Sequence, residues 1–395
     1  MEATRTKIVL GVTVDMSLML MRGFPQHLAD NGWEVHVVAS PGPALEQLSG
    51  LSGITTHSIP MRRGPAPLAD LRSLVAWVSL LRTIRPDVTS VGTPKAGLVG
   101  GLAAMLTRVP RRVYVLRGLR METVTGVKCA ILIAAERLAM LSAHRVLSVS
   151  PSLRDRAVEL GLAKAAKLTV LGSGSSNGVD LGEFDRSGFS DAELRDLRGQ
   201  LGIVDGVPVV GFVGRLTHDK GLDVLVQARK RLEDAGVDYQ LLIVGGVDDA
   251  GSELTVRALR QSGRPAVETG RVSNPAKYYA IMDFLCLPTL REGFPNVVLE
   301  AGAAGRPTIT TNATGSVDSV VDGTTGLVVQ SGDAEELANA IARLVSDTAT
   351  RSRMGGAAKD YVRANFSRQV VWERQLAFYT ARGPRGALTN RAGPR

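Results

Sequence analysis

The stretch at residues 283–311, DFLCLPTLREGFPNVVLEAGAAGRPTITT, constrains the fold more than any other part of the chain. A short apolar run ends at Pro288, which is typical of a buried strand. Pro295 suits the first turn of a helix, and Gly293 lets the backbone approach a ligand closely. We expect a helix over residues 296–304 and a second strand from residue 307 to 310. In open α/β sheets, the loop after such a strand lies in the crevice where ligands bind.

Two carboxylates lie in this stretch, Glu292 in the predicted loop and Glu300 on the predicted helix. By spacing alone they could be ordinary surface residues, because Glu is mostly exposed in folded proteins. Glu300, however, lies inside the apolar run VVLEAGAAG, where an unpaired carboxylate would be costly. Vicinal hydroxyls of a ligand would supply the hydrogen-bond donors it needs. The free amides at the start of the same helix suit a phosphate group.

Composition limits the class of protein. The 395 residues are enough for two domains, and 44% hydrophobic with 22% charged residues is typical of a globular chain. Cys129 and Cys286 lie in apolar runs, which favours buried thiols in a reducing compartment over a disulfide or a metal site. The first residues lack the apolar core of a signal peptide, and we expect a cytoplasmic protein without a membrane span.

The positive charge is concentrated in the first half of the chain. Residues 1–180 contain 21 Lys and Arg against 12 Asp and Glu, whereas residues 181–395 contain 26 of each. Only 4% of residues are aromatic and no nucleic-acid motif is present, so we expect no nucleic acid as a partner. The asymmetry favours an anionic membrane surface or a pyrophosphate group as the partner of the first half.

The first half opens with a strand at residues 7–11, a loop at 12–21, a helix, and a strand at 34–39. It lacks Gly-x-Gly-x-x-Gly, which argues against a dinucleotide dehydrogenase. Within the loop, Met19 and Met21 are expected to pack in the core, although a lipid-contacting rim is the alternative. Strands and helices alternate through both halves of the chain, which predicts an α/β fold.

Several longer motifs resemble one family. The motif from Glu292 to Glu300 within EGFPNVVLEA, followed by TGS and DGTTGLVV, is similar to the Glu-x7-Glu region of family 4, the retaining nucleotide-sugar-dependent glycosyltransferases. The resemblance extends from about Ile8 to Tyr379 and is closest to the bacterial branch that builds capsule, O-antigen and exopolysaccharide. It implies the GT-B fold, in which two Rossmann-like domains face each other across a cleft.

The resemblance also implies a division of the chain. We expect an acceptor-binding domain at residues 1–180 and a nucleotide-sugar-binding domain at residues 181–365. A helix at residues 366–382 would cross back to the first domain, and residues 383–395, rich in Gly, Pro and Arg, are expected to be disordered.

For the donor, the resemblance assigns roles to residues of the second half. Arg215 and Lys220, in a Gly-flanked loop that begins at Gly214, would bind the diphosphate, and Glu300 would bind the ribose hydroxyls. Glu292 would hold hydroxyls of the donor sugar. The backbone at Arg271 and Val272 would meet the nucleobase. The residues at the helix start would bind the phosphate, those with an N–H through their amides: Gly293, Phe294, Pro295, Asn296 and Val297.

For the acceptor, the resemblance points to Asp15 and Ser17 in the first loop and to Thr93 and Lys95 after a strand, although a plain capped turn would also explain the latter pair. Many family members have His-Gly where this chain has Arg117-Gly118. Arg117 cannot take up a proton in the way that His does, so we expect it to act only through its charge.

The sequence therefore predicts a metal-independent transferase that moves a sugar, with retention, from a nucleoside diphosphate, preferably UDP, to a lipid-diphosphate-linked saccharide. No Asp-x-Asp occurs in the chain, so no metal is expected. The protein would act as a peripheral enzyme on the inner face of the plasma membrane. Three alternatives stay open: a UDP-sugar 2-epimerase on the same fold, a transferase with a soluble small-molecule acceptor, and a non-catalytic partner subunit.

Overall fold

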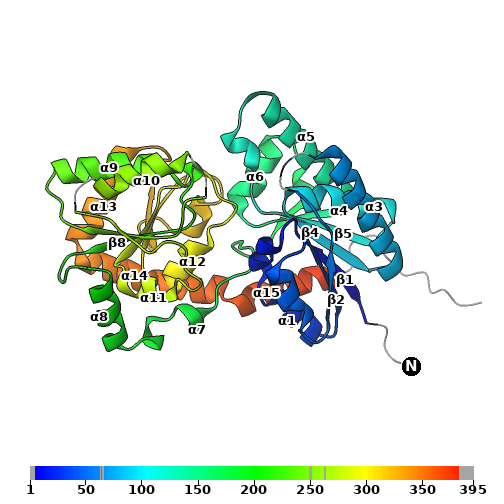
Figure 1. Cartoon of the computed structure of the whole chain (residues 1–395), viewed down its shortest axis with the longest axis horizontal. Helices are drawn as coiled ribbons and strands as arrows, with labels where there is room; N and C mark the ends of the chain where they lie inside the picture. Colours follow the sequence, from blue (N-terminus) through cyan, green and yellow to red (C-terminus); the bar gives the residue numbers. More distant parts are fainter. Residues whose placement is uncertain (1–4, 63, 65, 249–250, 262–263, 382–395) are drawn as a thin grey trace, which may run out of the picture.

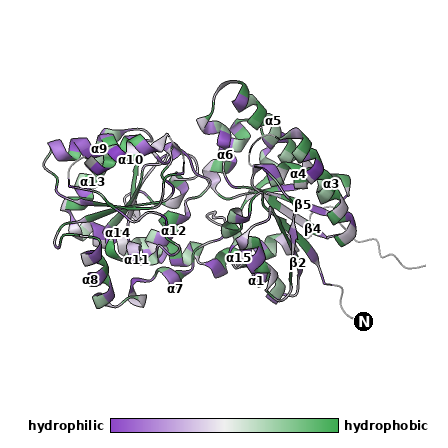
Figure 2. Ribbon diagram, viewed as in Figure 1, coloured by the Kyte–Doolittle hydropathy of each residue, from purple (hydrophilic) through white to green (hydrophobic). Residues whose placement is uncertain are grey.

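The chain forms two parallel sheets, each covered by helices on both faces (Figure 1). The structure is a computed structural model that describes residues 5–62, 64, 66–248, 251–261 and 264–381. Figure 2 shows hydrophobic residues along the strands at the centre of each domain. Because parallel sheets are covered on both faces, their strands are apolar throughout rather than alternating.

The first sheet has the strand order β3-β2-β1-β4-β5-β6-β7. Every residue of β4 is buried, as are all but the first residue of β1 and β2. The strands are β1 (Lys7–Gly11), β2 (Glu34–Ala39), β3 (Ile54–Ser58), β4 (Val88–Gly92), β5 (Arg111–Leu116), β6 (Arg145–Ser148) and β7 (Leu168–Val170).

The second sheet has the order β10-β9-β8-β11-β12-β13. In both sheets the order reverses beside the first strand, and this reversal is where α/β folds open a ligand crevice. The strands are β8 (Val209–Val213), β9 (Gln240–Val244), β10 (Val267–Glu268), β11 (Phe284–Leu287), β12 (Thr308–Thr311) and β13 (Gly326–Val329).

Helices connect successive strands in each domain. Those of the first domain are α1 (Phe24–Asp30), α2 (Pro43–Ser49), α3 (Pro67–Ile84), α4 (Pro94–Leu106), α5 (Gly126–Ser142) and α6 (Pro151–Glu159). Those of the second are α7 (Leu181–Phe184), α8 (Asp191–Gln200), α9 (Leu222–Asp234), α10 (Ser252–Gln261), α11 (Ala276–Ile281), α12 (Asn296–Ala303), α13 (Ala334–Ser346) and α14 (Thr348–Phe366).

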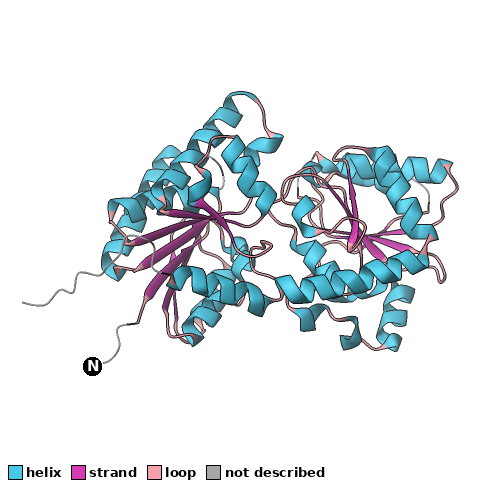
Figure 3. Cartoon of the chain, turned by 180° about the vertical axis from the view of Figure 1, so that it is seen from behind, coloured by secondary structure: helices cyan, strands magenta, loops and turns pink. Residues whose placement is uncertain are grey.

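The last helix, α15 (Arg368–Thr380), runs from the second domain onto the first, as the view from behind makes clear (Figure 3). The Tyr379 hydroxyl is 2.7 Å from Ser90 Oγ on β4, and Gln375 Nε2 donates to the Ser176 carbonyl. Trp372 Nε1 donates to Asn177 Oδ1 at 2.8 Å. These buried hydrogen bonds fix the end of the chain on the first domain.

The predicted α/β fold of two parallel-sheet domains is confirmed, and the strand and helix expected within residues 283–311 form as β11 and α12. Residues 12–21 are not simply a loop, because Asp15–Met21 forms a 3-10 helix, η1. Sequence reasoning also missed α2 and β3. The prediction for residues 383–395 lies outside the described residues.

A buried carboxylate on α5 has a consequence for stability. Glu136 is only 5% exposed, and its Oε1 accepts a hydrogen bond of 2.5 Å from the Tyr114 hydroxyl on β5. Burial raises the pKa of Glu136 to about 7, although the Tyr114 hydrogen bond favours the charged form. The folded pKa therefore lies above that of the unfolded chain, so the native state loses stability as pH rises from about 4.5 to about 7.

We expect Glu136→Gln to remove this pH-dependent loss, because an amide accepts the Tyr114 hydrogen bond without becoming charged. The stability of the variant relative to wild type should rise between pH 5 and pH 8 by up to about 3 kcal/mol. Thermal unfolding across this pH range measures the difference. Glu159→Gln, at an exposed position on α6, is the control and should give a constant difference. Parallel pH profiles for Glu136→Gln and wild type would contradict the expectation.

Candidate functional site

A cavity of about 710 Å³ lies between the two domains, at the carboxyl ends of strands from both sheets. The first domain contributes the segments after β1 and β4, with η1, and the second contributes the segments after β8 and β9. Seven of the predicted site residues line it: Ser17, Thr93, Lys95, Gly214, Arg215, Arg271 and Val272. The topology thus brings predicted donor and acceptor residues to one cavity.

Two glycines form part of its second-domain wall. Gly214 follows β8 with φ 148°, and Gly245 follows β9 with φ 150°. A Cβ on Gly245 would lie 1.8 Å from the Gly214 carbonyl oxygen, so a side chain cannot be accommodated without moving the loop. The two loops therefore approach closely, and this part of the wall is formed by backbone that an anionic ligand can reach.

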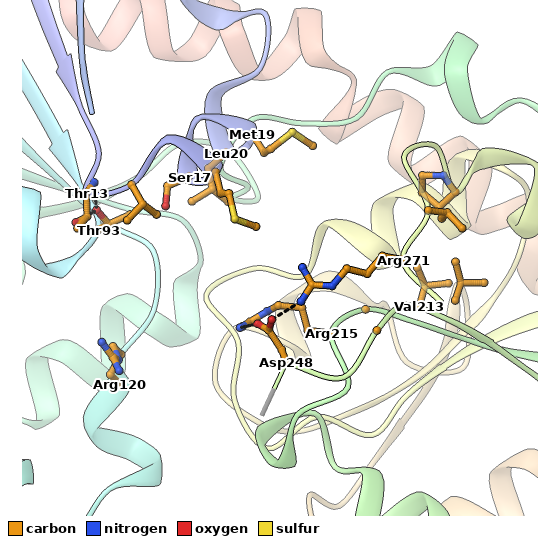
Figure 4. A pocket seen from close by; sticks show the side chains of 18 of the residues that line it. Thr13, Ser17, Met19, Leu20, Thr93, Arg120, Val213, Arg215, Asp248 and Arg271 are labelled. Atoms are coloured by element: carbon orange, nitrogen blue, oxygen red, sulfur yellow. Dashed lines mark hydrogen bonds and ion pairs between the residues drawn. The ribbon is translucent and has the colours of Figure 1, made fainter. Parts of the chain in front are cut away.

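Two arginines in the cavity share one carboxylate. Arg215 Nη1 lies 3.1 Å from Asp248 Oδ2, and Arg271 Nη2 bonds Asp248 Oδ1. In the close view both side chains converge on Asp248, opposite Ser17 and Thr93 of the first domain (Figure 4). Hydrogen bonds from Arg215 and Arg271 hold the pKa of Asp248 below its usual value. With side chains 58% and 60% exposed, both arginines have room to contact a ligand as well.

Glu292 and Lys220 bond each other rather than lining the cavity. Their side chains are 14% and 15% exposed, so this ion pair is largely removed from water. The Glu292 amide donates to the Thr314 carbonyl at 2.9 Å, which fixes its loop against the segment after β12. A carboxylate and an ammonium group held in this way are ordered before any ligand arrives.

Glu300 on α12 accepts a hydrogen bond of 2.6 Å from the Tyr279 hydroxyl on α11. Burial raises the pKa of Glu300 to about 7, the Tyr279 hydrogen bond opposes that rise, and the charge of Glu183 adds to it. The bond reaches Oε2, and among the described residues no partner bonds Oε1. Sequence analysis named ligand hydroxyls as donors to this carboxylate, and the structure adds a donor from the protein, the Tyr279 hydroxyl.

Arg117 and Asp15 do not line the cavity. Arg117 Nη1 donates to the Leu20 carbonyl at 3.1 Å beneath η1, and burial lowers the pKa of the guanidinium to about 10. The Asp15 carboxylate lies so close to Gly42 that a Cβ there would be 2.2 Å from its Oδ2. In this structure both side chains contact the first domain outside the cavity. This is a different position from the one expected for contacts with a substrate.

The predicted acceptor residues Thr93 and Lys95 have partners within the first domain. Thr93 Oγ1 accepts from the Thr13 amide at 2.9 Å, and Lys95 Nζ is 2.5 Å from Asp70 Oδ2. Thr93 has φ 69°, so the turn after β4 is strained for a residue with a side chain. The Thr93 side chain does not cap α4, because the Ala96 amide donates to Thr13 Oγ1 instead. A ligand contact of Thr93 or Lys95 stays a prediction.

The residues at the start of α12 lie close to the first domain. Gly293 meets the Arg117 carbonyl, and its own carbonyl accepts a hydrogen bond of 2.8 Å from Ser150 Oγ. Phe294 is 7% exposed and packs on Phe366, with ring centroids 5.3 Å apart. Pro295 caps α12, followed by Asn296 and Val297 in its first turn; the Asn296 Oδ1 atom is buried without a hydrogen-bond partner among the described residues.

Sequence reasoning missed several features of the site. Asp248 follows a short strand with no motif to mark it, and no pattern marked Tyr279 as the partner of Glu300. Met19 was expected in the core but is 63% exposed, whereas Met21 is buried as expected. Arg120 is exposed, lines the cavity and, among the described residues, has no ion-pair partner. Leu18 and Met21, three residues apart, are both buried, and Met19 lies between them in the sequence. This spacing could have predicted that Met19 is exposed.

The described residues contain no group of three or more His, Cys, Asp or Glu side chains arranged to hold a metal ion. Among the helices of the described ranges, none combines the length and the apolar character needed to span a bilayer.

The hydrogen bond between Tyr279 and Glu300 gives a prediction that can be tested without a substrate. Carbon-13 NMR of the Glu carboxylates should find two groups with a pKa near 7, Glu136 and Glu300, and Tyr279→Phe should raise the Glu300 value because it removes the hydrogen bond to the charged form. Tyr278→Phe, on the same helix, is the control and should leave the pKa unchanged. A Glu300 pKa near 4.5, or one indifferent to Tyr279→Phe, would show that this carboxylate is not the buried group described.

Comparisons with known proteins identify the family of this chain. Residues 21–174 match the family model described as glycosyl transferase 4-like domain, and residues 207–347 match the one described as glycosyl transferases group 1. The capsular polysaccharide biosynthesis glycosyltransferase CapM of Staphylococcus aureus is 38% identical over 94% of this chain and 96% of the relative. The 2-deoxystreptamine glucosyltransferase of Streptomyces kanamyceticus is 30% identical over 88% and 89%.

The chain is also similar to a more distant relative and to a solved structure. The N,N'-diacetylbacillosaminyl-diphospho-undecaprenol alpha-1,3-N-acetylgalactosaminyltransferase of Campylobacter jejuni is 24% identical over 79% of this chain and 82% of the relative. The crystal structure of Anabaena HepE in complex with UDP-glucose has a TM-score of 0.76 and 21% identity, over 95% and 99% of the two chains. Matching family models in both domains and a relative that aligns over nearly its whole length show that this chain is an enzyme of the GT-B glycosyltransferases.

Proposed function

We propose that this enzyme transfers a sugar, with retention, from a UDP-sugar to a hydroxyl group of a lipid-diphosphate-linked saccharide during the synthesis of a bacterial surface polysaccharide such as capsule. The observation that carries the proposal is the cavity itself, in which a cationic, glycine-walled face of the second domain opposes a polar face of the first. Bringing a donor and an acceptor to one such cavity turns an encounter of two substrates into a positioned reaction.

The donor would occupy the second-domain face. Arg215 and Arg271 are accessible cations beside backbone at Gly214 and Gly245, and two phosphates can approach that backbone closely. Glu300, with Oε1 unbonded among the described residues, would accept hydrogen bonds from ribose hydroxyls. HepE, whose fold this chain shares, is described in complex with UDP-glucose, which favours UDP as the nucleotide.

Stabilisation of developing negative charge would lower the activation barrier of the reaction. The leaving diphosphate gains negative charge as the glycosidic bond breaks, and Arg215 and Lys220 would stabilise that charge, as would the amides at the start of α12. Glu292 would bind hydroxyls of the donor sugar while it holds Lys220 in place. Retention would follow if the acceptor attacks from the face that the diphosphate leaves and the departing phosphate oxygen takes the hydroxyl proton. In this route the donor's own phosphate takes the proton, so the protein supplies no nucleophile.

The acceptor would occupy the first-domain face. Arg120 is a cavity-lining cation without an ion-pair partner among the described residues, and Ser17 offers a hydroxyl in the same cavity. Met16 and Met19, 58% and 63% exposed, add an apolar rim to the first-domain lining. A cation and an apolar rim in one cavity suit a phosphate attached to a lipid, and the name of the Campylobacter relative includes such an acceptor, a diphospho-undecaprenol.

A soluble acceptor is the second candidate. The Streptomyces relative, which aligns over most of this chain, is named for 2-deoxystreptamine, a small amino-cyclitol. The exposed apolar residues of the first domain favour the lipid-linked acceptor.

The outer face of α5 supports action at a membrane. Val127, Ile131, Leu138 and Leu141 are 41–78% exposed, and their spacing of four, seven and three residues places them on one side of the helix. Lys128 and Arg137 flank this stripe and are exposed. Apolar groups beside cations are typical of a helix that lies in the surface of an anionic membrane. The enzyme would therefore work as a peripheral protein on the inner face of the plasma membrane.

The function is tested by incubating the full chain with UDP-sugars, with and without an undecaprenyl-diphosphate-linked saccharide, and analysing the products by mass spectrometry. We expect a lengthened saccharide with a retained anomeric configuration and UDP released only when the acceptor is present. Epimerisation of the UDP-sugar without acceptor would instead identify a 2-epimerase. Transfer to 2-deoxystreptamine but not to the lipid-linked saccharide would favour the soluble acceptor.

Arg215→Gln should weaken UDP binding about 10- to 100-fold, because it removes a charge-assisted hydrogen bond to the diphosphate worth about 1.5–3 kcal/mol. Isothermal titration calorimetry with UDP measures this directly. Arg257→Gln, an exposed position on α10, is the matched control and should bind UDP like wild type. Equal UDP affinity in both variants would remove Arg215 from the donor site.

Replacing Ile131 and Leu138 together by Asp should reduce co-sedimentation with phosphatidylglycerol vesicles at least tenfold, because it places two charges in the apolar stripe of α5. Transfer to a short-chain, water-soluble acceptor should be unchanged. Leu254→Asp, an exposed leucine on α10 of the second domain, serves as the control and should leave vesicle binding intact. Undiminished binding of the double variant would mean that α5 does not contact the membrane.

A further inference from the structure

A second cavity, of about 560 Å³, lies at the opposite edge of the first sheet from the interdomain cavity. It opens where β4, β5 and β6 begin, at Val88, Arg111 and Arg145, whereas the interdomain cavity lies where strands end. Phe378, Tyr379 and Ala381, at the end of α15, form another of its walls. This place is remote from the chemistry, so none of the roles proposed above accounts for the residues that line it.

Four basic side chains line this cavity, which we call the basic pocket: Arg111, Arg112, His144 and Arg145. Its described lining contains no Asp or Glu, and within the described residues none of the three arginines forms an ion pair. Lys167 is a further cation near His144: burial lowers the pKa of His144, and the charges of Arg112 and Lys167 lower it further. Burial lowers the pKa of Arg111, Arg112 and Arg145.

Backbone carbonyls hold the arginines in place. Arg111 Nη1 donates to the Tyr379 carbonyl, and Arg112 Nε donates to the Ser142 carbonyl at 2.8 Å. Arg145 lies over the Phe378 ring at 4.0 Å and reaches Thr169 Oγ1 at 3.4 Å. These contacts use only some of the N–H groups, and none of the guanidinium nitrogens is among the buried atoms that lack partners. The remaining donors are therefore accessible to a ligand.

The charges in and around the basic pocket do not balance. Lys167 and the three arginines carry four positive charges. Tyr379 and Ser142 lie in the last turns of α15 and α5, and two helix C-termini together supply about one negative charge. Asp87, whose charge acts on Arg111, supplies another. An excess of about two positive charges remains, and partly buried like charges are costly without a counter-ion.

Residues 382–395 contain four arginines and no Asp or Glu, so their side chains add no negative charge. An anionic ligand would supply the charge that is missing. Planar guanidinium groups bind phosphate oxygens in pairs, and a phosphate or pyrophosphate carries about the charge that is missing.

We propose that the basic pocket binds a phosphate or pyrophosphate group at a site separate from the sugar-transfer cavity. Binding would tie the end of α15 to β5 and β6 and so strengthen the attachment of this helix to the first domain. The group could belong to a free anion or to a lipid headgroup. An adjoining cavity, which shares His144 and is walled by Leu141, Val158 and Leu162, would admit the apolar part of a lipid.

The test is a calorimetric titration of the full chain with inorganic phosphate and with pyrophosphate, in the presence of saturating UDP so that the donor site is filled. We expect one further anion to bind. Arg111→Gln and Arg145→Gln, made separately, should weaken that binding at least tenfold, and Arg145→Lys, which keeps the charge, should recover part of it. Arg353→Gln, an exposed arginine on α14, is the control and should bind like wild type.

A parallel arm distinguishes the two sources. If soluble anions bind as expected and the glutamine variants bind phosphatidylglycerol vesicles like wild type, the ligand is a free phosphate or pyrophosphate. If they do not bind, but binding to phosphatidylglycerol vesicles over phosphatidylcholine falls at least tenfold in both glutamine variants and not in Arg353→Gln, the ligand is a lipid headgroup. Thermal unfolding and UDP affinity identify any variant that has lost its fold. Two results together would overturn the proposal. UDP-saturated wild type would bind no anion, and the Arg145→Lys variant and those glutamine variants that fold would bind vesicles like wild type.

Discussion

The two domains meet backbone to backbone, and the interdomain cavity depends on that contact. A Cβ on Gly293 would lie 2.0 Å from the Arg117 carbonyl oxygen, and one on Gly315 would lie 2.4 Å from the Gly293 carbonyl oxygen. Only glycine allows the loop before α12 to come so near the first domain. Ser150 Oγ then bonds the Gly293 carbonyl, and Thr314 Oγ1 bonds Glu122 Oε1 at 2.7 Å. The distance between the donor face and the acceptor face follows from these contacts.

Around the cavity, most charged groups are already held by another part of the protein. Asp248 orients Arg215 and Arg271, Glu292 bonds Lys220, and Asp70 bonds Lys95. A substrate would exchange some of these partners without requiring the side chains to be reordered, which lowers the entropic cost of binding. Arg120 differs, because it lines the cavity without an ion-pair partner among the described residues.

Local patterns predicted the fold well, because buried parallel strands are continuous apolar runs and prolines mark the starts of α3, α4 and α6. The pairing of Glu292 with Lys220 could not be predicted, since the two lie 72 positions apart and meet only when β8 and β11 pair. Asp248 and Tyr279 were missed for the same reason. The Arg117 side chain lies beneath η1, where it donates to the Leu20 carbonyl, and no sequence motif predicts this hydrogen bond.

The central claim is that the second-domain face of the interdomain cavity holds a nucleoside diphosphate. A crystal structure of the chain with UDP tests it most directly. The account predicts phosphates beside Gly214 and Arg215, the base against the Arg271–Val272 backbone, and ribose hydroxyls within hydrogen-bond distance of Glu300. UDP bound elsewhere, with Arg215, Lys220, Glu292 and Glu300 pointing away from it, would contradict the account.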